Sequence, residues 1–260
     1  MKPRDQNFVN DTAAGLEPIA RAAWPPRETL TVGGWICRFT AGYSHRANSV
    51  AALGFPEGAD LAAAIARVES AYAARGLAPM FHITPLSAPA ELEAVLTARG
   101  YVQVCPTSVM IAEIDELSSA AGEPGEIRFV DRGDGDFAAL VVDASHSTAD
   151  GNERLDILSR VPSPHACVLA LNDGVPIACG LAVVQDGWAG FFLMRTNSRQ
   201  RRRGHARRVM GALGAWSKDA GATRGYLQVE DDNLPARALY ARAGFRDAYG
   251  YRLLRSPDGD

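Results

Sequence analysis

The residues best suited to chemistry lie between Arg199 and Phe245. The segment opens with basic residues around one glycine, Arg201-Arg202-Arg203-Gly204-His205-Ala206-Arg207. Apolar residues then recur at helical spacing, at Ala206, Val209, Met210, Leu213 and Ala220, which predicts an amphipathic helix that begins near Gly204. Backbone N–H groups at a helix start lack partners within the helix, and the helix dipole favours an anion there. Because Gly204 lets a phosphate approach the main chain, the pattern predicts a diphosphate site.

A second group of residues follows at a short distance. It consists of a β-like run over 226–229, then Asn233-Leu234-Pro235-Ala236-Arg237-Ala238-Leu239-Tyr240, closed by Gly244-Phe245. Arg201-x-x-Gly204-x-Ala206 resembles the acyl-CoA signature of the GNAT superfamily of N-acetyltransferases, and the Asn233 to Phe245 run resembles that family's second signature. Each motif alone has low specificity, whereas both in order with a strand between them are specific. The resemblance covers roughly residues 125 to 255.

The resemblance implies a fold, a reaction and a cofactor. The fold class is α/β (α+β), with a mixed, mostly antiparallel central sheet flanked by helices. The activity is acetyl transfer from acetyl-CoA, without a metal, to a primary amine of a small molecule or peptide, by direct transfer in a ternary complex. The fourth strand, where it splays from its neighbour, would polarise the thioester carbonyl through backbone N–H groups. The implied cofactor-binding residues are Met194, Arg195, Thr196, Arg201, Arg202, Arg203, Gly204, His205, Ala206, Arg207, Asn233 and Ala236.

Tyr240 is the implied catalytic residue, placed near the cofactor sulfur. A phenol has an ordinary pKa of about 10, so it is protonated at neutral pH and can donate a proton to a departing thiolate. Each of these residues also has a structural interpretation: Tyr240 as a core aromatic, Asn233 as a helix cap, and His205 as a loop residue whose backbone matters. The arginines could instead form a solvated face or a nucleic-acid patch.

The general base and the acceptor are not defined by the resemblance. The fourth strand, 188–196, contains no acidic residue. The candidate bases are Glu230, Asp231, Asp150 and Glu153, with deprotonation through solvent as an equal alternative. The polar loop expected over 145–152 suggests a polar acceptor. Candidate acceptor-binding residues are Arg46, Asn48, His146 and Glu230, and a hydrogen-bonded turn is the alternative for the first two.

The order of elements predicts two domains. The first half is expected to contain helices over 16–24, 60–75 and 90–99, with β runs over 30–40, 79–84 and 101–114. The second half is expected to begin with a strand over 127–130 and helices over 136–144 and 153–160. Strands over 167–171, 177–184, 188–196 and 245–254 complete its sheet. The stretch SSAAGEPG reads as a linker, which divides the chain into domains 1–117 and 126–260 joined by 118–125.

The first half carries a faint echo of the second. Residues 92–101 align with 236–245, so that Gly100-Tyr101 matches Gly244-Phe245 and Leu96 takes the place of Tyr240. We interpret the first half as a degenerate GNAT-like domain that lacks the cofactor loop. Chance similarity is the alternative, because junctions of helix, glycine and strand are common.

Composition limits the classes of function. The chain has 260 residues, of which 47% are hydrophobic and 22% charged, as in globular proteins, and its net charge of −3 argues against general nucleic-acid binding. We expect no membrane association, a cytoplasmic bacterial protein, and a monomer or homodimer. The cysteines, Cys37, Cys105, Cys167 and Cys179, occur singly, which favours buried reduced thiols over metal ligands. The alternatives in function are a non-catalytic acyl-CoA-binding module and an aminoacyl-tRNA-dependent transferase.

Overall fold

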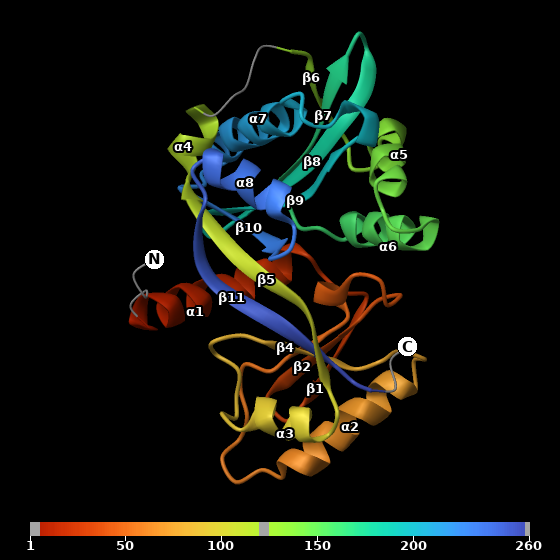
Figure 1. Cartoon of the computed structure of the whole chain (residues 1–260), viewed down its shortest axis with the longest axis vertical. Coiled ribbons are helices and arrows are strands. Elements are labelled where there is room, and N and C mark those ends of the chain that lie inside the picture. Colours follow the sequence, from red (N-terminus) through yellow and green to blue (C-terminus); the bar gives the residue numbers. More distant parts are fainter. Residues whose placement is uncertain (1–5, 120–124, 258–260) are drawn as a thin grey trace. The chain divides into compact units, whose positions relative to one another are not determined.

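The computed structural model describes residues 6–119 and 125–257 (Figure 1). Their contacts divide the chain into two compact units. Unit 1 contains the described residues up to Arg21, then Pro26–Ser108 and the described residues from Ala248 onward. Unit 2 contains Ala22–Pro25 and Val109–Asp247. The linker predicted over 118–125 does not coincide with a boundary between these two units. Ser118 and Ser119 end a helix, and 120–124 lie outside the described residues.

Five strands of unit 1 are hydrogen-bonded to their neighbours in the order β1-β2-β3-β4-β11. Its elements are α1 (Gln6–Ala23), β1 (Glu28–Val32), β2 (Trp35–Phe39), the 3-10 turn η1 (His45–Ala47), β3 (Val50–Ala51), α2 (Leu61–Ala73), β4 (Met80–Ile83), α3 (Leu92–Ala98), the first part of β5 (Val102–Glu113) and most of β11 (Arg246–Arg255). β3 and β4 are parallel, and the other pairs with a known register are antiparallel. β1 and β2 form a hairpin around Gly33, and the side chain of Asp60 caps α2 by accepting a hydrogen bond from the N–H of Ala63 at 3.0 Å.

The core of unit 1 forms where α2 and α3 cover this sheet. Trp35 and Phe81 from the strands pack with Ile65 and Tyr72 from α2 and Leu96 from α3. All five side chains are essentially inaccessible to solvent, so burial of apolar surface at about 25 cal/mol per Å² stabilises this arrangement.

The first helix is longer than the sequence predicts. The sequence predicts a helix only from Leu16, whereas α1 begins at Gln6. The helical signal is weak because the buried face is built mainly from alanines, Ala13, Ala20 and Ala23, at spacings that follow the helical repeat. Pro18 lies inside the helix, where its missing N–H and its ring disfavour a helical prediction.

Unit 2 has the strand order β5-β10-β9-β8-β7-β6. Its elements are α4 (Ile114–Ser119), β6 (Ile127–Val130), α5 (Gly135–Asp143), α6 (Thr148–Ser159), β7 (His165–Asn172), β8 (Val175–Gln185), β9 (Trp188–Thr196), the 3-10 turn η2 (Ser198–Gln200), α7 (His205–Asp219), β10 (Arg224–Glu230) and α8 (Leu234–Arg242), with the second part of β5. β6 to β9 form an antiparallel meander, and β10 pairs with β9 in parallel. This is the mixed, mostly antiparallel sheet flanked by helices that the resemblance to the GNAT superfamily implies.

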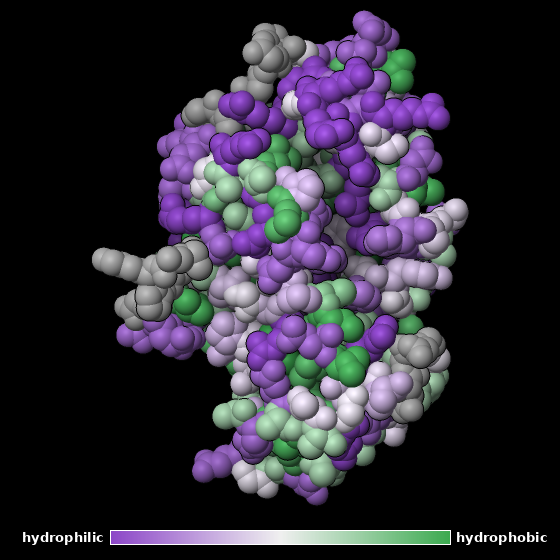
Figure 2. Space-filling model, in the orientation of Figure 1, coloured by the Kyte–Doolittle hydropathy of each residue, from purple (hydrophilic) through white to green (hydrophobic). Residues whose placement is uncertain are grey.

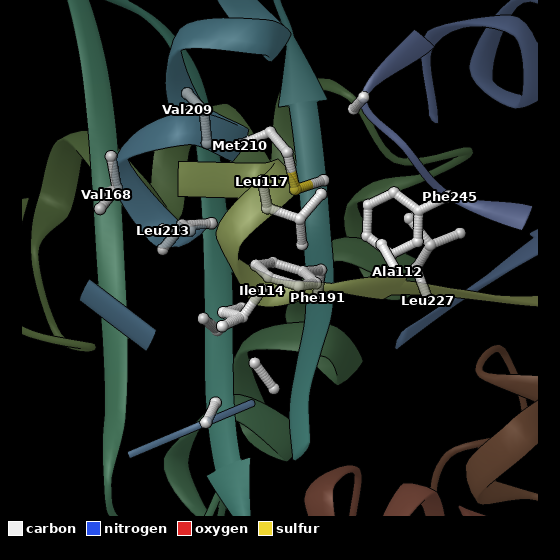
Figure 3. Close-up of a cluster of buried hydrophobic side chains, with 14 of the residues drawn as sticks. Ala112, Ile114, Leu117, Val168, Phe191, Val209, Met210, Leu213, Leu227 and Phe245 are labelled. Atoms are coloured by element: carbon white, nitrogen blue, oxygen red, sulfur yellow. The ribbon is translucent and has the colours of Figure 1, made fainter. Parts of the chain in front are cut away.

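Helix α7 lies against this sheet along its apolar face (Figure 3). Val209, Met210 and Leu213 are buried in one cluster with Phe191 from β9 and Phe245, which directly precedes β11. The 3-to-4-residue spacing of the buried α7 residues is the amphipathic pattern seen in the sequence. This packing fixes the start of α7, and with it the arginine-rich loop.

A tight turn joins β7 and β8 in unit 2. Asp173 and Gly174 both have positive φ, at 51° and 74°, as a two-residue hairpin turn of the type I′ class requires. The loop predicted over 145–152 is shorter than expected, because α6 already begins at Thr148. The Ser147 side chain caps α6 by accepting a hydrogen bond from the N–H of Asp150 at 3.1 Å, which draws the polar residues after it into the first turn.

Four further observations concern composition and surface. No helix within 6–119 or 125–257 is long and apolar enough to cross a bilayer. Within the same described residues, no group of three or more His, Cys, Asp or Glu side chains is arranged to hold a metal ion. Cys37, Cys167 and Cys179 are buried, Cys105 is partly buried, and no disulfide links the four. The visible face of unit 2 is mostly hydrophilic, with scattered hydrophobic residues (Figure 2).

Candidate functional site

The strands β9 and β10 separate within unit 2. Their parallel register has three pairs and ends at Tyr226 opposite Gly190. On the other side of β9, the register with β8 shifts between Cys179 and Leu181. Leu193 has a φ of 49°, which marks a bulge in β9. The predicted donor segment, Met194 to Thr196, follows this bulge and lies beyond the last β9–β10 pair.

The start of α7 has the features of an anion site. Gly204 is the N-cap, its φ is 83°, and no side chain caps the helix there. A Cβ built on Gly204 would meet no atom within 4 Å, so the main chain is accessible from outside. Arg201, Arg202 and Arg203 are exposed in the preceding turn, and Ala206 is half-buried in the first turn of α7. The backbone N–H groups and the arginines together suit a diphosphate.

Two side chains near the start of α7, those of His205 and Arg208, contact each other. His205 is only 8% exposed, and its Nδ1 lies 2.6 Å from Nη2 of Arg208. Because a guanidinium only donates, Nδ1 accepts and the ring proton of the neutral imidazole sits on Nε2. Burial, followed by Arg208 and Arg203, lowers the pKa of His205. The side chain of His205 is therefore buried against Arg208, and the role of its backbone stays a prediction.

Helix α8 places the second motif. The side chain of Asn233 accepts a hydrogen bond from the N–H of Ala236 at 3.2 Å and so caps the helix. Asn233 is exposed and Ala236 is half-buried against the core of unit 2. The structure thus gives Asn233 the capping role, which leaves its amide N–H₂ exposed for a further contact.

Tyr240 is partly buried at the end of α8. Its ring meets that of Phe245 edge to face, with centroids 6.0 Å apart. Burial raises the pKa of Tyr240, and the nearby Arg195 guanidinium opposes that shift. The phenol therefore keeps its proton at neutral pH, and a cation stands close enough to favour negative charge near it.

The side chain of Arg195 lies in an environment that the sequence does not predict. It lies on β9 opposite Cys179, and its Nε is buried with no hydrogen-bond partner among the described residues. Burial lowers the pKa of Arg195 first, then the charge of Arg154, while Asp150 and Tyr240 act in the opposite direction. The sequence predicts a role only for the Arg195 backbone. The position of its side chain near Tyr240 is a finding of the structure.

The acidic candidates for the general base differ in burial. Asp150 and Glu153, both on α6, are 2% exposed, whereas Glu230 and Asp231 are exposed. Asp150 is already engaged: Oδ2 accepts from the N–H of His146 at 3.1 Å, and Oδ1 lies 2.9 Å from Nε of Arg154. The spacing of four residues between Asp150 and Arg154 on a helix is the signal that could have identified this pair.

The candidate acceptor residues are dispersed. His146 is exposed and belongs to unit 2. Arg46 and Asn48 belong to unit 1, where Asn48 is 1% exposed and its Nδ2 donates to the carbonyl of Ser44 at 3.1 Å. The N–H of Thr40 donates to Oδ1 of Asn48 at 2.6 Å. Asn48 therefore secures the turn of unit 1, which is the structural alternative raised for it.

Comparisons with known proteins identify the family of this chain. The family described as "Probable histone acetyltransferase Rv0428c C-terminal" matches residues 13–254. "Uncharacterized N-acetyltransferase YobR" of Bacillus subtilis (strain 168) is 28% identical over 253 residues, which cover 94% of this chain and 100% of that protein. "Probable histone acetyltransferase Rv0428c" of Mycobacterium tuberculosis (strain ATCC 25618 / H37Rv) is 28% identical over 250 residues, covering 92% and 72%.

Solved structures show the same fold. A GCN5-related N-acetyltransferase from Kribbella flavida superposes with a TM-score of 0.64 at 19% identity, covering 100% of this chain and 98% of that one. A tandem GNAT protein from the clavulanic acid biosynthesis pathway superposes with a TM-score of 0.63 at 12% identity, covering 99% and 97%. Since the family match spans nearly the whole chain, the protein belongs to the Rv0428c C-terminal acetyltransferase family, within the GNAT superfamily of N-acetyltransferases.

Proposed function

We propose that this protein transfers an acetyl group from acetyl-CoA to a primary amine of a small molecule or peptide, by direct transfer in a ternary complex. The observation that carries the proposal is the opening between β9 and β10 after Gly190, followed along the chain by the uncapped start of α7 at Gly204. The first feature suits a thioester arm between two strands, and the second suits a diphosphate.

The residues of unit 2 fit acetyl-CoA by their chemistry. Backbone N–H groups from Gly204 to Arg207 would hold the diphosphate, and Arg201, Arg202 and Arg203 would add charge from the exposed turn. When bound, acetyl-CoA would supply an activated acyl group. Met194, Arg195 and Thr196 would offer backbone donors to the acyl oxygen. An oxyanion-type contact of this kind is worth about 3 kcal/mol in other enzymes.

Tyr240 would act as the general acid. Its raised pKa keeps the proton on Oη at neutral pH, which is the form needed to protonate a leaving thiolate. The guanidinium of Arg195 would stabilise negative charge that develops beside the phenol. Both residues belong to unit 2, so this assignment requires nothing from unit 1.

Calorimetry with acetyl-CoA, followed by an amine screen with detection of released thiol, tests the proposal. We expect one binding site and turnover with at least one amine. Binding without turnover across the screen would instead favour a non-catalytic acyl-CoA-binding module. An absence of binding would contradict the proposal and favour an aminoacyl-tRNA donor, which a tRNA-binding measurement would then examine.

A further inference from the structure

Unit 1 contains a buried group of ionisable side chains that the proposed function does not use. Glu17 from α1, Arg38 from β2 and His82 from β4 are 1%, 4% and 4% exposed. Tyr249 from β11 donates through Oη to Oε1 of Glu17 at 2.7 Å. On the other carboxylate oxygen, Nδ1 of His82 lies at 3.9 Å and Nη1 of Arg21 at 3.7 Å. We call these five side chains the unit 1 polar cluster.

Arg38 lacks a counter-ion in this cluster. Its Nε donates to the carbonyl of Ser49 at 3.1 Å, and its Nη2 donates to Oγ of Ser49 at 2.8 Å. Within the described residues, no carboxylate lies at ion-pair distance from Arg38, since Glu17 interacts with it only at longer range. A guanidinium that is buried without an anion carries a large desolvation penalty.

The hydrogen bonds to Ser49 leave one edge of the guanidinium available. A guanidinium has five N–H groups, one on Nε and two on each Nη. Ser49 uses the Nε group and one on Nη2, so the outer fork formed by Nη1 and Nη2 remains. A planar fork of this kind matches the two oxygens of a carboxylate.

The charged side chains that act on His82 are mainly guanidiniums. Burial lowers the pKa of His82 well below its usual range, and the charges of Arg38, Arg21 and Arg46 lower it further. His82 is therefore neutral at physiological pH, and its Nε2 is buried with no hydrogen-bond partner among the described residues. Arg21 lies beside Glu17, whereas Arg38 stays uncompensated. The group as a whole needs one further negative charge.

We propose that the unit 1 polar cluster binds a small molecule through its carboxylate group. The carboxylate would accept two hydrogen bonds from the outer fork of Arg38, and His82 in its Nε2–H form would supply a third. A monoanion matches the single uncompensated guanidinium, and a planar anion matches its fork better than a tetrahedral phosphate. This site is built from unit 1 alone, so it does not depend on acetyl transfer by unit 2.

The test uses the full-length protein with acetate, glycine and succinate as carboxylate probes, and inorganic phosphate as the competing anion. Binding is measured by calorimetry and by the shift in unfolding temperature. Arg38→Lys keeps the charge but removes the planar fork, and we expect at least a tenfold loss of affinity, of the order seen for bidentate contacts. Arg99→Lys is the matched control, since Arg99 lies in the same unit and pairs on the surface with Glu69.

A second variant keeps the test valid where Arg38→Lys fails to fold. His82→Gln preserves a hydrogen-bonding side chain without the imidazole, and we expect a smaller loss, of about threefold to tenfold. The imidazole ¹⁵N resonance of His82 in the wild type should move on addition of the carboxylate that binds. The proposal is overturned if no carboxylate binds, if Arg38→Lys and Arg99→Lys bind alike, or if phosphate binds more tightly than every carboxylate.

Discussion

The ends of α3 in unit 1 and α8 in unit 2 have the same backbone but different chemistry. At the end of α3, the N–H of Gly100 donates to Thr97 at 3.0 Å and that of Tyr101 donates to Leu96 at 3.1 Å. At the end of α8, Gly244 donates to Ala241 at 3.2 Å and Phe245 donates to Tyr240 at 3.0 Å. Both glycines have positive φ, 85° and 98°.

The two helix ends differ in the residue whose carbonyl accepts the final hydrogen bond. Leu96 is fully buried in the core of unit 1, whereas Tyr240 is partly exposed beside Arg195. The same helix ending thus serves packing in one unit and presents a protonated phenol in the other. This supports the interpretation of unit 1 as a degenerate GNAT-like repeat, which we keep as a proposal. The following substitutions examine how far the two units differ.

The largest effect is expected at the start of α7. Gly204→Glu should weaken acetyl-CoA binding about a hundredfold or more, because it strains the left-handed backbone and places a carboxylate where the diphosphate would lie. Calorimetry provides the measurement. Gly221→Glu is the matched control: Gly221 follows the other end of α7, also has positive φ at 90°, and also has open space around its Cβ position. Equal losses in the two variants would remove the assignment of the anion site.

Tyr240→Phe comes next in size. We expect turnover to fall about a hundredfold, because the phenol proton is lost, with acetyl-CoA affinity nearly unchanged. Steady-state kinetics with the amine found in the screen measures this. Tyr101→Phe makes the same chemical change after α3, where the hydroxyl of Tyr101 donates to Glu69 at 3.1 Å, and it should leave turnover intact. Unchanged turnover in Tyr240→Phe would show that the phenol is not the acid.

The same two regions indicate what the sequence could predict. The hairpin at 172–174, the α7 pattern and the order of strands in unit 2 follow from local signals, namely turn residues and periodicity. The extent of α1 could not be predicted, because its buried face is rich in alanine and Pro18 disfavours a helix. The start of α6 could not be predicted either, because the Ser147 cap and the polar residues after it have the composition of a loop.

The polar cluster of unit 1 had no signal in the sequence. Glu17, Arg38, His82 and Tyr249 are far apart along the chain and form no motif, and only the folding of four elements brings them together. The role of the Arg195 side chain was also hidden, since an arginine in a strand does not disclose its neighbours. Motifs of short span were thus predictable, whereas clusters built by tertiary contacts were not.

A smaller effect distinguishes the glycines that end the two helices. An alanine at either position meets the left-handed strain, at a cost of about 1 kcal/mol. At Gly244 a Cβ would also lie 2.5 Å from Oε2 and 3.1 Å from Cβ of Glu116, whereas at Gly100 the nearest atom is Cγ of Pro257 at 3.7 Å. Gly244→Ala should therefore destabilise the protein more than Gly100→Ala, by a further ~0.5–1 kcal/mol. Urea unfolding of both variants measures the difference, and the reverse order would contradict it.

The smallest effect is a pH dependence that arises from the buried histidines of the two units. Burial lowers the pKa of His82 in unit 1 and of His205 in unit 2, so the folded protein binds fewer protons than the unfolded chain just below pH 6.5. Stability should therefore be complete above pH 6.5 and decrease as the pH falls below that value, by up to about 1.4 kcal/mol per pH unit for each histidine.

His82→Gln removes the titrating group of unit 1 and His205→Gln that of unit 2. Each variant should show a shallower loss of unfolding free energy between pH 6.5 and the acid limb than the wild type does. The larger flattening is expected for His82→Gln, because burial, with Arg38, Arg21 and Arg46 adding to it, lowers the pKa of His82 well below its usual range, whereas the pKa of His205 is lowered less far. Chemical denaturation at a series of pH values measures both slopes. A wild-type slope retained in His82→Gln would mean that its imidazole titrates normally in the folded protein, and would remove the charge argument for the unit 1 polar cluster.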